Sequence, residues 1–79
     1  MNYPMYSMRD LKAGSFSPPE CSINVDTAKR TFDMRLHNDR SLGFSPADYE
    51  LFCVGYFDPE NGELEGCLPV CVVNGGELF

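Results

Sequence analysis

Four cysteines and one histidine are the residues of this chain with the greatest capacity for chemistry. Cys67 and Cys71 are four positions apart, which on a β-strand separates them by about 13 Å. That separation is too long for a disulfide or a shared metal ion. A zinc site would need a bend at Pro69, with its ligands drawn from Cys21, Cys53, Cys67, Cys71 or His37. We therefore expect buried free thiols and no metal, with a zinc site or a disulfide as the alternatives.

No spacing of nucleophile, base and acid in the sequence indicates catalysis. His37 lies opposite the apolar stripe of a predicted helix, close to Arg30 and Asp33, which is typical of a solvated histidine. Glu63 and Glu65 can bind a cation weakly, but acids at a hairpin end more often serve solvation. The chain also has no glycine-rich phosphate loop with a lysine. We expect neither an enzyme nor a cofactor.

Charge is distributed unevenly along the chain. The net charge is −6, yet all six lysines and arginines precede residue 41, and seven acids follow it. An acidic chain normally repels the phosphates of nucleic acid. An acidic surface commonly serves solubility, but it can also bind a basic host or phage protein. We place that candidate contact at Asp58, Glu60, Glu63 and Glu65.

The basic residues offer a different candidate site, for nucleic acid. The bases that lie in or directly after a predicted helix are Lys29, Arg30, Arg35 and Arg40. Asp26 and Asp33 lie among them, so there is no continuous basic stripe and the field that attracts phosphates is diluted. Phe52 and Tyr56 share one face of a predicted strand and could stack on bases. Packing beneath the helix is the competing expectation for these two aromatic residues.

A hairpin is the clearest structural pattern in the sequence. Residues 49–57 are aromatic, β-branched or small, and both faces of this strand are apolar, which is typical of a central strand. Residues 58–62 then predict a turn, in which Pro59 presets φ and Gly62 adopts a positive φ. Residues 63–65 should pair back onto the first strand.

The flanking segments complete the predicted elements. Gly66 should interrupt the returning strand, and residues 68–74 then form a final strand. Pro69 lacks a backbone donor, which confines it to a sheet edge or to the beginning of that strand. Residues 5–12 are expected to form another edge strand. A helix capped by Asn24 or Asp26 should run to about residue 38, with a core stripe of Val25, Ala28, Phe32 and Leu36.

These elements predict a small α+β domain: an antiparallel sheet of three or four strands with one helix packed on one face. We expect one domain over residues 1–79, with frayed ends at residues 1–4 and 77–79. A second subunit would add stability, so a homo-oligomer is possible. The sequence has no apolar run of membrane-spanning length and no signal peptide, and we expect a cytoplasmic protein with no membrane partner.

Residues 46–62 carry a resemblance to a known family. The run Pro46-Ala47-Asp48-Tyr49-Glu50-Leu51-Phe52, with Val54-Gly55-Tyr56-Phe57-Asp58 and Asn61-Gly62 after it, resembles the small non-structural protein of gokushovirus-type microviruses. These are bacteriophages with small circular single-stranded DNA genomes. Further matches are Arg9-Asp10-Leu11-Lys12 and Ala28-Lys29-Arg30-Thr31-Phe32, so that the resemblance covers most of residues 8–73.

The resemblance implies a DNA-binding protein, or an accessory to viral single-stranded DNA synthesis and packaging, in the host cytoplasm. Its implied partners are single-stranded DNA and host or phage replication proteins. One difference limits the comparison: family members commonly carry a His before the Pro-x-Asp segment, where this chain has Gly43-Phe44-Ser45. No role of that His can therefore be transferred. The alternative is an acidic protein-interaction module that contacts no DNA.

Overall fold

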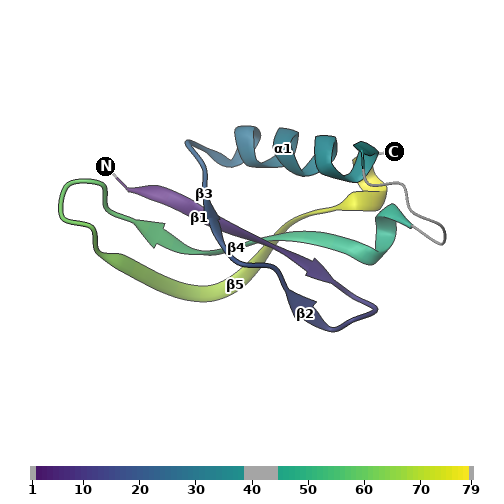
Figure 1. Cartoon of the computed structure of the whole chain (residues 1–79), viewed down its shortest axis with the longest axis horizontal. Helices are drawn as coiled ribbons and strands as arrows, with labels where there is room; N and C mark the ends of the chain where they lie inside the picture. Colours follow the sequence, from purple (N-terminus) through teal and green to yellow (C-terminus); the bar gives the residue numbers. More distant parts are fainter. Residues whose placement is uncertain (1, 39–44, 79) are drawn as a thin grey trace.

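One helix lies across one face of an antiparallel sheet in the computed structural model, which describes residues 2–38 and 45–78 (Figure 1). In chain order the elements are β1 (Tyr3–Asp10), β2 (Ser15–Phe16), β3 (Glu20–Cys21), α1 (Val25–Asn38), η1 (Pro46–Asp48), β4 (Tyr49–Phe57), β5 (Leu64–Asn74) and η2 (Gly75–Leu78), where η marks a 3₁₀-helix. This arrangement confirms the predicted α+β class. Within the described residues, no helix is long and apolar enough to cross a membrane.

The strands of the sheet follow the order β2-β1-β4-β5, and β3 also pairs with β1. All of these pairings are antiparallel. The sequence did not predict β2 and β3, because strands of two residues are too short to show an alternating pattern. They pair along the outer side of β1. The path β2-β1-β4-β5 thus holds four strands, as expected, with β3 beside it, but the prediction that β1 is an edge strand was wrong.

Helix α1 has the predicted start and end. The side-chain Oδ1 of Asn24 accepts a hydrogen bond from the Thr27 N–H at 2.8 Å, which satisfies one of the free donors of the first turn. Ala28, Phe32 and Leu36 are buried at helical spacing. Val25 is 37 % exposed, so its assignment to the core was wrong and the buried stripe is one turn shorter.

The core forms where this stripe meets the sheet. Its buried hydrophobic residues are Tyr6, Ala28, Phe32, Leu36, Leu51 and Val73. Around them pack the partly buried Met8, Tyr49, Cys53, Val72 and Leu78. Burial of one leucine or phenylalanine side chain contributes about 1.5–3 kcal/mol. A core of this size therefore supports only modest stability.

Strand β4 is central, as its two apolar faces predicted, but its faces have different surroundings. Leu51 is buried against the helix, and since neighbouring side chains alternate, Phe52 points to the opposite face. There it packs against Phe16, with 5.3 Å between ring centroids. Tyr56 is 41 % exposed. The expectation that these two residues pack beneath the helix was therefore wrong.

Strand β5 is one strand of eleven residues, where the sequence predicted two pieces. Gly66 does not interrupt it and pairs with Gly55. The register shifts between Cys53 and Gly55 of β4, which pair with Val70 and Gly66 of β5. The irregular pairing therefore lies between Gly66 and Val70, in the segment that contains Pro69. The edge position predicted from Pro69 is confirmed.

Regular structure extends farther toward both ends of the chain than predicted. Strand β1 begins at Tyr3, which pairs with Phe57, and η2 extends to Leu78, which packs against the core. Residues 3–4 and 77–78 thus lie within elements and not in frayed ends.

The turn between β4 and β5 has the predicted positive φ. Gly62 adopts φ 78°, and its N–H donates to the Asp58 carbonyl oxygen at 2.8 Å. Asp58 in turn donates its N–H to the Glu63 carbonyl oxygen at 2.9 Å. A residue with a Cβ is strained at such a φ.

We expect Gly62→Val to lower the free energy of unfolding by about 1–3 kcal/mol through backbone strain. The matched control is Gly66→Val, because Gly66 lies within β5 and no atom lies within 4 Å of an added Cβ. Valine favours strands, so the control should retain its stability. Denaturant unfolding of both variants tests this, and equal midpoints would contradict the assigned turn.

Candidate functional site

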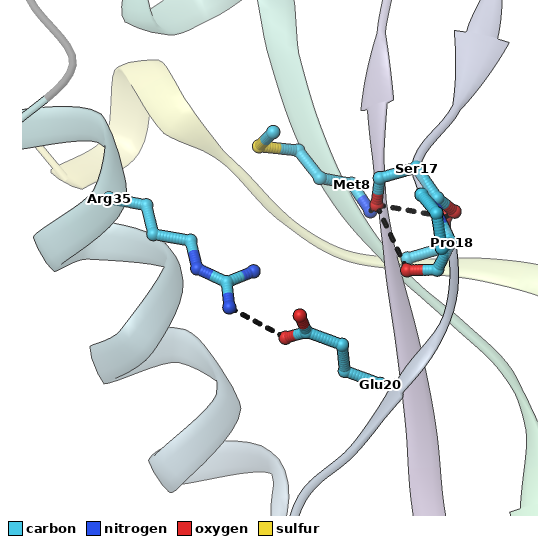
Figure 2. A network of polar contacts seen from close by, with 6 residues as sticks. Met8, Ser17, Pro18, Glu20 and Arg35 are labelled. Atoms are coloured by element: carbon cyan, nitrogen blue, oxygen red, sulfur yellow. Dashed lines mark hydrogen bonds and ion pairs between the residues drawn. The ribbon is translucent and has the colours of Figure 1, made fainter.

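The helix bases predicted for nucleic acid are partly neutralised. Arg35 Nη2 lies 2.7 Å from Glu20 Oε2, across the space between α1 and β3 (Figure 2). Among the described residues, Lys29 and Arg30 make no ion pair. Arg40 lies outside the described residues. The structure therefore leaves two of the four predicted bases as unpaired cations on α1.

A small cavity lies between α1, β1 and the segment that leads to β3. Its volume is about 70 Å³, and Phe32, Leu51 and Arg35 are among the residues that line it. Small-molecule sites usually enclose about 300–1,000 Å³. This cavity holds a few water molecules at most and no nucleotide.

Hydrogen bonds fix the segment beside this cavity. Ser7 is 3 % exposed, and its Oγ donates to the Ser17 carbonyl oxygen at 2.6 Å. The Met8 N–H donates to Ser17 Oγ at 2.9 Å (Figure 2). Because Ser17 is held at both its backbone and its side chain, the crossing from β2 to β3 stays close to β1.

The sheet face away from α1, which we call the open face, carries an aromatic and cationic cluster. The Arg9 guanidinium lies 5.4 Å from the centroid of the Phe16 ring, and Phe16 meets Phe52 edge to face. Phe16 is 43 % exposed. The buried Nε of Arg9 has no hydrogen-bond partner among the described residues. Glu50 pairs with Arg9 across the ladder and so places an acid on this face.

Sequence reasoning found only Phe52 of this cluster. Phe16 lies between the predicted elements, and nothing in its neighbourhood indicated that a two-residue strand would pair it with Arg9. Arg9 itself was assigned only to an edge strand. The alternation of β1, which places Ser7 and Arg9 opposite Tyr6 and Met8, was the one pattern that could have indicated this face.

The acids proposed for protein contact lie along the turn and the start of β5, at the end of the hairpin farthest from α1 (Figure 1). They are Asp58, Glu60, Glu63 and Glu65. Asp58 Oδ1 accepts a hydrogen bond from the Glu60 N–H at 2.9 Å, so this carboxylate also shapes the turn. Within residues 2–38 and 45–78, none of the four makes an ion pair.

The cysteines are free, but their predicted burial was wrong for three of the four. Cys21, Cys67 and Cys71 are exposed, whereas Cys53 is half-buried and packs against the core. Cys67 Sγ donates to the Cys53 carbonyl oxygen at 3.8 Å. Desolvation of the thiol raises the pKa of Cys67. Burial, together with the negative charge of Glu50, raises the pKa of Cys71.

Neither a metal site nor a catalytic base emerges from the described part of the chain. No three His, Cys, Asp or Glu side chains gather there closely enough to hold a metal ion. His37 Nδ1 lies 2.8 Å from Asp33 Oδ1, one helical turn earlier, and both side chains are more than two-fifths exposed. The histidine is thus a surface residue of α1, as predicted.

We expect the folded protein to react slowly with iodoacetamide at Cys67 and Cys71, although both thiols are exposed. Because the pKa of both thiols is raised, less thiolate is present at a given pH. The alkylation rate should therefore still increase above pH 9.0, the ordinary pKa of a cysteine thiol. Mass spectrometry of labelled peptides measures this, with the denatured chain as the reference.

After non-reducing denaturation all four thiols should react, and elemental analysis should find no stoichiometric zinc. One zinc per chain, or two unreactive thiols, would contradict the assignment.

The comparisons with known proteins identify a family for the chain. A family model described as Phage ORF5 protein matches residues 3–78. No curated protein and no solved structure matches the chain. The matched range runs from β1 to η2 and so includes every element of the fold. The chain therefore belongs to the Phage ORF5 protein family and is a small bacteriophage protein.

Proposed function

We propose that this protein is a non-structural accessory protein of a single-stranded DNA phage of the microvirus type. It assists viral DNA synthesis or packaging in the host cytoplasm, by binding and not by catalysis. Its ligand is single-stranded DNA, and replication proteins are the second possible partner. The observation that carries the proposal is the cluster of Arg9, Phe16 and Phe52 on the open face.

This cluster has the chemistry that single-strand binding requires. Aromatic rings on a sheet accept stacked bases of any sequence, and an arginine beside them adds a cation–π contact and a charge for phosphate. Phe16 is 43 % exposed, and its edge-to-face contact with Phe52 holds the ring in place. No helix of residues 2–38 and 45–78 lies across the open face, so an extended strand can reach these side chains (Figure 1).

The charges of the chain limit the strength of such binding. Lys29, Arg30 and Arg35 belong to α1, on the side of the sheet opposite the open face, so they act on a strand there only through the long-range field. Even if all four bases assigned from the sequence were engaged, they would neutralise at most about four phosphates, so the logarithm of the affinity should fall with that of the salt concentration at a slope of about −3 or shallower. Arg35 and Lys12 are already paired with Glu20 and Asp48. Binding is therefore weak, and stacking must contribute much of it.

The acidic hairpin favours a second function. Its four carboxylates make no ion pair in the described chain and sit together at one end of the molecule. Such a surface suits a basic patch on a host or phage replication protein, through which the protein would act without touching DNA.

We expect Phe16→Ala to weaken binding of a fluorescently labelled oligothymidine about 5- to 150-fold at low salt, because one stacked base contributes about 1–3 kcal/mol. The matched control is Met34→Ala, which removes a side chain 59 % exposed on α1. Arg9→Gln and Arg30→Glu should both weaken binding. Glu63→Lys with Glu65→Lys should strengthen it, since repulsion of the phosphates falls.

Fluorescence anisotropy at several salt concentrations provides the measurement, and circular dichroism verifies the fold of each variant. No binding by the folded protein at high micromolar concentration would eliminate direct DNA contact. A pull-down of purified replication proteins that is lost with Glu63→Lys and Glu65→Lys would then establish the acidic hairpin as the working surface. Equal losses with Phe16→Ala and Met34→Ala would exclude the open face as the DNA site.

A further inference from the structure

One edge of the sheet is long, apolar and uncovered. Strand β5 pairs with β4 on one side, and no strand in the described chain pairs with its other side. Eight consecutive residues of β5, from Leu64 to Cys71, are exposed. Leu64 is 69 %, Leu68 87 % and Val70 57 % exposed. Long edge strands of this kind are usually shortened, charged or covered. On the opposite side of the sheet, the short strands β2 and β3 cover the edge of β1.

The charge along this edge limits what can cover it. Residues 66–74 contain no charged side chain, although the chain carries a net charge of −6. Two copies of such a chain repel each other wherever their acids approach. They can meet at this neutral segment, where apolar side chains from both copies are available. The charge pattern therefore fits a second copy of the same chain.

The exposed area of the molecule points the same way. A compact monomer of 8.9 kDa exposes about 4,800 Å², whereas this chain exposes 5228 Å² and measures 43 × 22 × 17 Å. A stable dimer buries about 1,000 Å² in total or more, which is about 500 Å² per copy. That is about a tenth of the present surface, and the eight exposed residues of β5 can supply it.

We propose that two copies of this protein associate through β5, side by side and antiparallel about a two-fold axis. Antiparallel pairing lets the same surface of both copies meet itself, as a two-fold interface requires. Leu68 and Val70 of each copy then lie beside the same two residues of the partner. Both sheets join into one, and the two helices lie on the same face of it.

Pro69 shapes this contact. Proline has no N–H, so the outer edge of β5 cannot form an unbroken hydrogen-bonded ladder with any neighbour. The apolar side chains on either side of Pro69 must therefore contribute more of the affinity than the backbone. Once paired, each copy has used its long edge, and only the short strands β2 and β3 remain, so the assembly closes at two copies.

We expect sedimentation equilibrium to give twice the chain mass of 8.9 kDa at micromolar concentration. Leu68→Lys and Leu68→Glu, at a side chain 87 % exposed, should each sediment as folded monomers. Mixed in equal amounts, the two variants should restore the dimer, since opposite charges then meet across the axis. Met34→Glu, the matched control on α1, should remain a dimer.

Wild-type protein that stays at the single-chain mass up to high micromolar concentration would overturn the proposal. Dimers that persist in both Leu68 variants would equally overturn it, because they would place the interface elsewhere. Hydrogen exchange of the unmodified protein adds a measurement that needs no variant. Amide protection in β5 must increase with protein concentration, and constant protection would contradict the contact. DNA binding by the open face does not enter any of these readouts.

Discussion

The packing of α1 against the sheet is the interaction on which the rest of the structure depends. The buried residues of the helix meet single residues from β1, β4 and β5, which come from three distant parts of the chain. One helix thus holds the central strands in a fixed order. Domains of this size are stable by about 5 kcal/mol. Phe32 or Leu36 alone contributes a large part of that through burial, and few other buried residues can compensate for a loss.

A single helix can cover only one face of a sheet, and this limit gives the molecule its functional surfaces. The covered face is occupied by packing and retains a cavity of about 70 Å³. The open face leaves Arg9, Phe16 and Phe52 accessible, and the outer edge of β5 lies beyond the reach of the helix. The features assigned to DNA contact and to self-association thus both arise because the core is small and one-sided.

The elements with strong local patterns were predictable from the sequence, and the contacts made between distant segments were not. Helix α1 has periodic apolar residues, strand β4 is a run of aromatic, β-branched or small residues, and Gly62 marks the turn. Strand β2 has no such pattern, because its two residues are strands only through their pairing with β1. The ion pair that neutralises Arg35 depends on Glu20, fifteen residues earlier, so the sequence overstated the basic character of α1.

The glycine pair within the hairpin divides it into two parts with different energetics. Gly55 and Gly66 face each other across β4 and β5, and a Cβ on Gly55 would overlap the Glu65 carbonyl oxygen, so the two strands approach closely there. No buried core residue lies between these glycines along the hairpin. The outer segment, residues 56–65, therefore adds no buried residue to the core and is joined to the sheet mainly by strand pairing, within the hairpin and between Tyr56–Phe57 and the start of β1. It can unzip and reclose as a local unit while α1 and the inner strands stay folded.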